Sequence, residues 1–219
     1  MKPPIFFGLP PDQITDQHPG LIVMVCGPSH VGKTYACEHM IAPRLGAAFL
    51  SIDLLYSEAV MSAGMTPRTD DHYSVELIRA RSRARDRKWE AGQEEAFFAA
   101  YTRLVEDAMR AAPGALVLDG GTLSREEEAR LVLKAARQVH NKTERLIRLW
   151  LTPPYQQWLA NRIKRQASLG VTTEKIANLV EATYEKRREQ AQPPPVKGIS
   201  DLRVSTPQEL ERIVDAALG

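Results

Sequence analysis

The chain has 219 residues, of which 43% are hydrophobic and 26% are charged, with a formal net charge of +2. These values fit one sizeable globular domain that can bury its own core, and the balanced charge means that any basic surface must be local. No apolar run approaches the length that spans a bilayer, and the proline-rich start MKPPIFFGLPPDQ has too short an apolar stretch for a signal peptide. We therefore expect a cytoplasmic protein without a membrane partner.

The first predicted strand, residues 21–26 (LIVMVC), runs directly into a glycine-rich loop that fits G-x-x-x-x-G-K-[ST], the Walker A pattern. This phosphate loop consists of Gly27, Pro28, Ser29, His30, Val31, Gly32, Lys33 and Thr34. In the pattern the glycines let the backbone approach a polyphosphate, the lysine reaches the β- and γ-phosphates, and the hydroxyl ligates Mg²⁺. A helix to about Leu45 follows and adds the partial positive charge of its N-terminus. The loop predicts a bound nucleotide, ATP or GTP, but does not specify the reaction.

The remaining elements alternate between strands and helices. Further strands are expected at residues 47–52, 115–118, 146–151 and 202–204. Helices are expected at residues 54–63, about 75–112 with an interruption near Gly92, 124–140, a segment opened by Pro153, about 173–190 and 207–218. The helix at 124–140 begins with a capping-box pattern, in which Ser124 is followed by Glu127. Alternation of this kind implies a parallel sheet covered by helices on both faces.

Two carboxylates follow predicted strands, at the edge where ligands bind in such sheets. Asp119, after ALVL, resembles the Walker B acid that holds the Mg²⁺ shell, so Thr34 and Asp119 are the predicted metal residues. Asp53, after AFLSI, is placed where a general base could take a proton from an acceptor hydroxyl. Either carboxylate could instead cap a helix or form a salt bridge in a loop.

Two arginines on the predicted helix after Pro153 share one face. Arg162 and Arg165 are three positions apart, so both guanidinium groups could converge on a transferring phosphoryl group. Phosphoryl transfer requires positioning and charge neutralisation, which arginines on a flap would supply. The predicted catalytic residues are therefore Lys33, Asp53, Arg162 and Arg165, with a solvated basic helix as the alternative for the two arginines.

The segments GPSHVGKT, SIDLLY, VLDGGTLSREEEARL, LTPPYQQWLANRIKR and VTTEKIANLVEATYE, in this order, resemble the small P-loop kinases. They are most similar to the bacteriophage polynucleotide 5′-hydroxyl kinases and to relatives that phosphorylate 5-hydroxymethyluracil in DNA. The resemblance covers about residues 21–190 and implies ATP and Mg²⁺ as cofactors, and a host cytoplasm if the protein is viral. It departs after Asp53, because the 5′-kinases carry D-D-Y-R there, with an arginine that grips the acceptor strand, whereas here Asp53 is followed by Leu54-Leu55-Tyr56.

The expected fold is α/β, a nucleoside-monophosphate-kinase-like P-loop domain with a five-stranded parallel sheet and helices on both faces. One domain would cover residues 1–219. It would comprise an N-terminal arm (1–20), a helical acceptor-binding insert (about 64–112) and an arginine-bearing lid (about 153–190).

An arginine-rich segment within the predicted insert is the most unusual local feature. Its arginines alternate with other residues: Arg79, Arg81, Arg83, Arg85 and Arg87. If extended, it would put all five on one side, as a ladder for a phosphate backbone with Trp89 stacking a base. If helical, which the surrounding alanines favour, it would cluster Arg79, Arg83 and Arg87 on one face with the other two nearly opposite. A plain solvated helix is the alternative.

We therefore expect an ATP-dependent kinase whose acceptor is a hydroxyl on nucleic acid, with DNA as a partner. Its candidate acceptor residues are Arg79, Arg83, Arg87 and Trp89. The first candidate acceptor is 5-hydroxymethyluracil in phage DNA, as in DNA hypermodification, followed by a 5′-hydroxyl end. The alternatives are a small-molecule, nucleotide or toxin-type sugar-nucleotide kinase and, in a different class, a non-catalytic nucleotide-dependent binding module that would have no use for Asp53.

Overall fold

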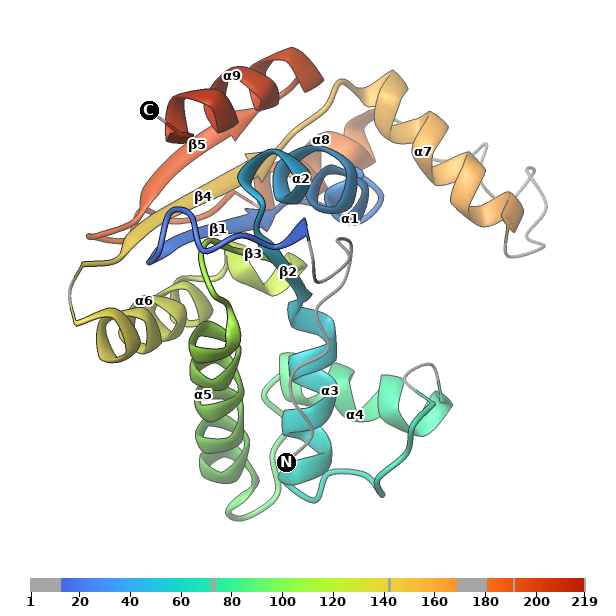
Figure 1. The fold of residues 1–219 in the computed structure, drawn as a ribbon. Coiled ribbons are helices and arrows are strands. Elements are labelled where there is room, and N and C mark those ends of the chain that lie inside the picture. The colour runs from blue at the N-terminus through green and yellow to red at the C-terminus, as the bar shows by residue number, and fades with distance from the viewer. Residues whose placement is uncertain (1–12, 72–73, 142, 169–180, 191, 219) are drawn as a thin grey trace.

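The structure is a computed structural model that describes residues 13–71, 74–141, 143–168, 181–190 and 192–218. At its centre lies a sheet whose five strands run parallel in the order β2-β3-β1-β4-β5 (Figure 1). The strands are β1 (Leu21–Cys26), β2 (Ala48–Ser51), β3 (Leu116–Asp119), β4 (Arg145–Leu151) and β5 (Ser200–Val204). The predicted five-stranded parallel sheet is confirmed. β2 is shorter than predicted, because the chain is already helical at Ile52.

The helices follow the predicted order. The phosphate loop leads into one helical run made of α1 (Lys33–Ala36), a π-helical turn (Cys37–Ile41) and α2 (Ala42–Leu45). The others are α3 (Ile52–Ser62), α4 (Val75–Arg85), α5 (Gln93–Ala111), α6 (Glu126–His140), α7 (Tyr155–Ser168), α8 (Glu181–Gln190) and α9 (Pro207–Leu218). Residues 1–12 of the predicted arm and 169–180 of the predicted lid lie outside the described residues. Within the described ranges, no helix combines the length and apolar character that crossing a membrane requires.

The predicted capping box of α6 is wrong. Ser124 belongs to a 3₁₀ turn, Gly121–Ser124, and its hydroxyl donates to the carbonyl oxygen of Gly121 at 2.7 Å. The residue at the N-cap position of α6 is Arg125, which makes no side-chain capping hydrogen bond. The serine hydroxyl is used within the preceding turn and does not reach the first amides of the helix.

The sheet has a hydrophobic core on each face, because successive side chains of a strand point to opposite sides. Ile22 and Met24 of β1 pack in a cluster with apolar residues of α3, α4, α5 and α6. Val23 and Val25 pack in a second cluster with residues of the α1–α2 run, α7, α8 and α9. In Figure 1 the first layer of helices lies below the sheet and the second above it. This sandwich confirms the prediction of helices on both faces.

The predicted helical insert consists of two helices that pack differently. α5 is amphipathic, and its residues Phe97, Tyr101 and Val105 are buried in the core below the sheet. The ring of Tyr56 on α3 lies 4.7 Å from that of Phe97 and 5.6 Å from that of Tyr101, centroid to centroid. α5 is therefore part of the layer that covers the sheet. Together α3, α4 and α5 extend away from the strands as the lower lobe of the molecule (Figure 1).

A fully buried arginine joins the last two strands to the turn that follows β3. Arg148 of β4 donates from Nε to Asp201 Oδ1 at 2.6 Å and from Nη2 to Asp201 Oδ2 at 3.0 Å. Its Nη1 donates to the carbonyl oxygen of Leu123, and its Nη2 to that of Pro194, at 3.2 and 2.6 Å. Every guanidinium nitrogen thus has an acceptor, which is the condition for burying this charge.

We predict that Arg148→Met lowers the free energy of unfolding by about 3 kcal/mol, because it leaves the carboxylate of Asp201 unpaired and two carbonyls without donors. Urea unfolding followed by circular dichroism measures the loss. The control is Arg103→Met, which removes an exposed ion pair to Asp107 at 3.9 Å and should cost less than about 1 kcal/mol. Equal losses in the two variants would contradict this account of Arg148.

Candidate functional site

The carboxyl ends of β1, β3 and β2 bring the predicted site residues to one edge of the sheet. β3 lies between the other two strands, and its last residue, Asp119, is in register with Val25 of β1 and Ser51 of β2. The phosphate loop leaves β1 after Cys26, and α3 begins immediately after Ser51, with Asp53 in its first turn. The loop and both carboxylates therefore meet where ligands bind in parallel sheets.

The backbone of the phosphate loop adopts conformations that favour glycine. Gly27 has a φ of 141°, and a Cβ at this position would lie 2.6 Å from the carbonyl oxygen of Leu151, the last residue of β4. Gly32 has a φ of 90° and precedes the α1–α2 run, and His30 also has a positive φ, of 69°. The two motif glycines are thus explained by a close backbone approach and by left-handed backbone, respectively.

Lys33 folds back over the loop. Its ammonium group donates to the carbonyl oxygens of Gly27 at 3.2 Å and Pro28 at 3.0 Å. Burial lowers the pKa of Lys33, and the charges of Asp119 and Asp53 oppose that shift. Because the ammonium is held by neutral carbonyls, its charge is available to an anion in the loop.

Thr34 and Asp119, the predicted metal residues, contact each other directly. Thr34 Oγ1 donates to Asp119 Oδ2 at 2.7 Å. Burial raises the pKa of Asp119, whereas hydrogen bonds from Thr34 and Ser51 and the charge of Lys33 lower it. A hydroxyl and a carboxylate oxygen fit Mg²⁺, which takes oxygen ligands and completes its shell with water and substrate phosphates. In the described part of the chain no group of three or more His, Cys, Asp or Glu could hold a metal alone.

Asp53 lies in the first turn of α3 and not at a strand end, because the chain becomes helical at Ile52. Its side chain is 52% exposed, and Oδ1 accepts a hydrogen bond from Arg85 Nη2 at 2.6 Å. The start of α3 lies close to β3 at Gly120, where a Cβ would be 2.8 Å from the Cβ of Ile52. Asp53 is near enough to raise the pKa of Asp119. Asp53 also forms a salt bridge with Arg85, the role expected from the sequence as the alternative to a general base.

Trp158 attaches α7 to the phosphate loop. Its indole Nε1 donates to the carbonyl oxygen of Ser29 at 2.9 Å. The ring is fully buried and stacks on Tyr184 of α8, with 4.9 Å between centroids. The hydroxyl of Tyr184 donates in turn to the carbonyl oxygen of Pro153, just before α7. These contacts hold the described part of the predicted lid beside the loop.

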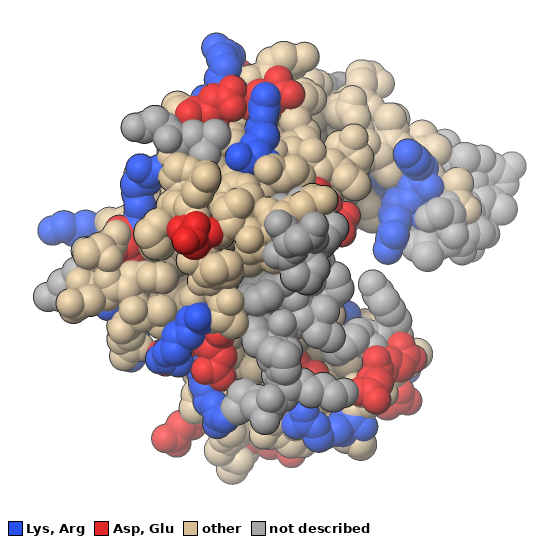
Figure 2. Space-filling view, in the orientation of Figure 1, with Lys and Arg blue, Asp and Glu red and all other residues tan. Residues whose placement is uncertain are grey.

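The arginines of α7 lie on the side of the phosphate loop. Arg162 lies over the Trp158 ring, 5.5 Å from its centroid, and its Nε and Nη1 atoms are buried without a hydrogen-bond partner in the described ranges. The pKa of His30 is lowered first by burial and then by nearby cations. These cations are Arg162, Lys33, Arg165 and Arg187. Figure 2 shows the surface hollowed between α7 and the lower lobe, with basic side chains of α7 facing the hollow.

The arginine-rich segment is helical, so the extended ladder is wrong and its helical alternative is confirmed over Val75–Arg85. Of the candidate acceptor arginines Arg79, Arg83 and Arg87, the last two are held by contacts within the protein. Arg83 Nη2 donates to the carbonyl oxygen of Met65 at 2.7 Å. Arg87 lies beyond the end of α4 and forms an ion pair with Glu127 of α6. These contacts give both side chains a structural role.

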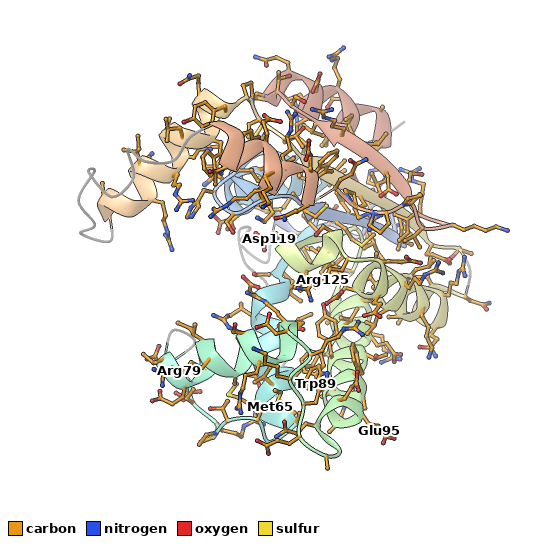
Figure 3. The ribbon with its side chains drawn as sticks, turned by 180° about the vertical axis from the view of Figure 1, so that it is seen from behind. Met65, Arg79, Trp89, Glu95, Asp119 and Arg125 are labelled. Carbon is orange, nitrogen blue, oxygen red and sulfur yellow. The ribbon has the colours of Figure 1, made fainter. Side chains whose placement is uncertain are left out.

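Trp89 and Arg79 lie apart from the site. The Trp89 ring packs against Phe97 and Phe98 of α5, at centroid distances of 5.2 and 6.2 Å. This packing accounts for Trp89 and gives no support to a base-stacking platform. Arg79 is exposed on α4 and lies away from Arg125, as Figure 3 shows. The stripe of α4 that approaches Asp53 is the opposite one, which contains Arg81 and Arg85.

Sequence reasoning missed several residues around the loop. They are Ser51, which hydrogen-bonds Asp119; Asn161, whose Nδ2 lies 3.7 Å from the Cβ position of Gly32; and Arg187 of α8, which lowers the pKa of His30. Asn161 directly precedes Arg162, but successive helical residues point about 100° apart, so the predicted role of Arg162 did not indicate Asn161. Arg187 sits in the polar sequence EKRREQ, which carries no signal that separates it from a solvated helix.

We predict that binding of a non-hydrolysable ATP analogue raises the pKa of His30. In the free protein burial, and then nearby arginines and Lys33, lower the pKa of His30, and triphosphate charge in the loop would offset the effect of these cations. Proton NMR of the imidazole during a pH titration measures the shift, and His30→Asn, which tolerates positive φ, identifies the resonance. An unchanged pKa at saturating nucleotide would contradict binding at this loop.

Comparisons with known proteins add only distant similarities. No family model and no curated protein matches the sequence. Among solved structures, a candidate kinase from Chloroflexus aurantiacus j-10-fl shares 15% identity over 91% of this chain and 97% of its own, with a TM-score of 0.48. A sugar kinase from Janibacter sp. HTCC2649 shares 16% identity over 91% of this chain and 93% of its own, with a TM-score of 0.44. An uncharacterized protein from Eubacterium ventriosum ATCC 27560 shares 9% identity over 91% of this chain and 98% of its own, with a TM-score of 0.45. At these values we draw no functional conclusion from the similarities.

Proposed function

We propose that this protein is an ATP-dependent kinase that transfers the γ-phosphate of ATP to a hydroxyl group on nucleic acid. One observation carries the proposal: a phosphate loop and a solvent-open carboxylate share one edge of the sheet. The loop contributes Lys33 and Thr34, and Thr34 is hydrogen-bonded to Asp119 at the end of β3. The carboxylate is Asp53, on the side of the lower lobe. Arg162, two of whose nitrogens have no hydrogen-bond partner within the described ranges, adds positive charge from α7.

The proposed chemistry assigns one task to each group. The acceptor oxygen bonds to the γ-phosphorus, the bond to the β–γ bridging oxygen breaks, and ADP leaves. Asp53 takes the proton of the acceptor hydroxyl. Lys33 and Arg162 neutralise charge on the phosphoryl and leaving oxygens. Thr34 and Asp119 would hold Mg²⁺, which would supply positive charge to the phosphates of ATP.

We propose nucleic acid as the acceptor because the carboxylate side of the site is rich in arginine. Arg81 and Arg85 approach Asp53 and its helix from α4, and Arg125 contacts the backbone of Arg85. This charge suits a phosphate backbone better than a neutral sugar. The sharpest version of the proposal is 5-hydroxymethyluracil in phage DNA, and the next is a 5′-hydroxyl end.

Transfer of label from γ-labelled ATP to a panel of acceptors tests the proposal. The panel contains duplex DNA with and without 5-hydroxymethyluracil, 5′-hydroxyl oligonucleotides, free nucleotides and simple sugars. Labelled DNA supports the proposal, and its rate should fall steeply with ionic strength because phosphate contacts release counterions. Label on sugars or free nucleotides alone would indicate a small-molecule kinase. The absence of label on every acceptor, with intact ATP binding, would favour a binding module.

We predict that Asp53→Asn lowers kcat by about 10²- to 10⁴-fold, because the amide cannot accept the proton of the acceptor. The affinity for ATP, measured by titration calorimetry, should be unchanged, because Asp53 lies on the acceptor side. The matched control is Asp107→Asn on α5, which removes a partly exposed carboxylate paired with Arg103 and Arg110 and should leave kcat as in the wild type. Unchanged kcat in Asp53→Asn would remove the general base from the mechanism.

We also predict that Lys33→Met lowers kcat by at least about 10²-fold, because it removes a preorganised cation from the phosphate loop. Single-turnover label transfer at saturating ATP measures the chemical step separately from ATP binding. A variant that recovers the wild-type rate at saturating ATP would limit Lys33 to nucleotide affinity, which contradicts the proposed role.

A further inference from the structure

Two arginines of α4 face α3 at the position of the proposed base. Arg85 Nη2 donates to Asp53 Oδ1 at 2.6 Å, and one turn earlier Arg81 Nη1 donates to Ser57 Oγ at 3.2 Å. Asp53 and Ser57 are likewise one turn apart on α3, so the two contacts run in parallel between the helices. Arg81 and Arg85 are here called the inner arginines, in contrast to Arg79 on the exposed face.

The inner arginines have more hydrogen-bond donors than partners. A guanidinium carries five N–H donors, yet the Nε atoms of both Arg81 and Arg85 are buried without an acceptor in the described part of the chain. Arg85 is positioned further by the Tyr56 ring, whose centroid lies 5.8 Å from its Cζ. These Nε atoms are closed to solvent, but the Arg85 side chain as a whole is 36% exposed, so an anion can approach its guanidinium group.

A third guanidinium adjoins the inner arginines. Arg125 Nη1 donates to the carbonyl oxygen of Arg85 at 3.0 Å, and Figure 3 shows Arg125 between Asp119 and the lower lobe. Burial raises the pKa of Glu128, and the positive charges of Arg125 and Arg85 partly oppose this rise, so both arginines lie near its carboxyl group. Among the described residues, Asp53 is the carboxylate paired with this group. The three guanidinium groups therefore face two carboxyl groups, those of Asp53 and the buried Glu128, and positive charge remains in excess beside the base.

We propose that Arg81, Arg85 and Arg125 bind a phosphate group of the acceptor, adjacent to the hydroxyl that reacts. This inference rests on the proposed kinase function and adds a substrate class, namely an acceptor that already carries a phosphate before transfer. The phosphate belongs to a nucleoside monophosphate or to a phosphodiester of a strand. Arginine suits either one, because its planar fork binds phosphate through two parallel hydrogen bonds.

This subsite also explains how an acceptor is aligned with the base. Asp53 contacts one terminal nitrogen of Arg85, so the other terminal nitrogen can contact a phosphate. One side chain then holds both the base and the substrate phosphate, and it fixes the distance between the hydroxyl and the carboxylate. Lys33 and Arg162 lie on the phosphate-loop side and serve the triphosphate, so the two anion sites use separate cations.

The test compares three acceptors with the same reacting group. They are the nucleoside of 5-hydroxymethyluracil, its 5′-monophosphate and a short duplex that contains the base. In the double variant Arg81→Gln/Arg85→Gln, we expect KM for the two phosphorylated acceptors to rise about tenfold to hundredfold, with KM for the nucleoside unchanged. ATP affinity should also be unchanged, which shows that the variant is folded. The control Arg110→Gln removes an exposed arginine of α5 and should match the wild type.

Binding of the 5′-monophosphate without ATP tests the subsite independently of turnover. If no acceptor is phosphorylated, the kinase proposal fails, but affinity for the monophosphate that falls about tenfold in the double variant still supports the subsite. Preference of the wild type for monophosphate or duplex identifies the source of the phosphate. Three results would overturn the proposal: equal losses for phosphorylated and unphosphorylated acceptors, no binding of either phosphorylated acceptor, or loss with Arg79→Gln but not with the double variant.

Discussion

The close approach of the phosphate loop to β4 is the constraint on which the rest of the site depends. Gly27 lies against the carbonyl oxygen of Leu151, where a side chain would overlap it. This approach lets the loop turn back over the sheet edge, so that Lys33 reaches the loop carbonyls and the carbonyl of Ser29 accepts from Trp158. One residue without a side chain therefore positions the loop, its lysine and α7 together.

The positively charged side chains of the site form two groups, one beside the phosphate loop and one beside Asp53. Lys33 is held by carbonyl oxygens on the loop side, and Arg162 approaches from α7. Arg85 approaches from the opposite lobe and is paired with Asp53. In the proposed function, two anions would bind close to each other, and each would have its own cations to offset their mutual repulsion. Such an arrangement suits transfer between a triphosphate and a second phosphorylated molecule.

Local signals predicted the sheet, the phosphate loop and the acid at the end of β3, because each depends on a few consecutive residues. What was missed depends on contacts between distant segments. Arg85 and Asp53 are 32 positions apart, and helical periodicity separates the two arginine stripes of α4 without showing which one faces α3. Trp89 was predicted to stack on a base because the sequence does not show that its ring packs against Phe97, which lies on the next helix. Ser124 fits the capping-box pattern for α6, but its hydroxyl donates to the carbonyl oxygen of Gly121 within the preceding 3₁₀ turn.

The buried Arg148 couples the order of protein synthesis to completion of the site. Its Nη1 supports the carbonyl of Leu123, in the turn that directly follows Asp119, and its Nε depends on Asp201 of β5. The ribosome adds β5 after the phosphate loop, both carboxylates and α7. During vectorial folding, the turn behind Asp119 therefore gains its full support only when β5 joins the sheet. A nascent chain that stops short of β5 would leave the Arg148 guanidinium without its carboxylate partner, next to the turn that follows β3.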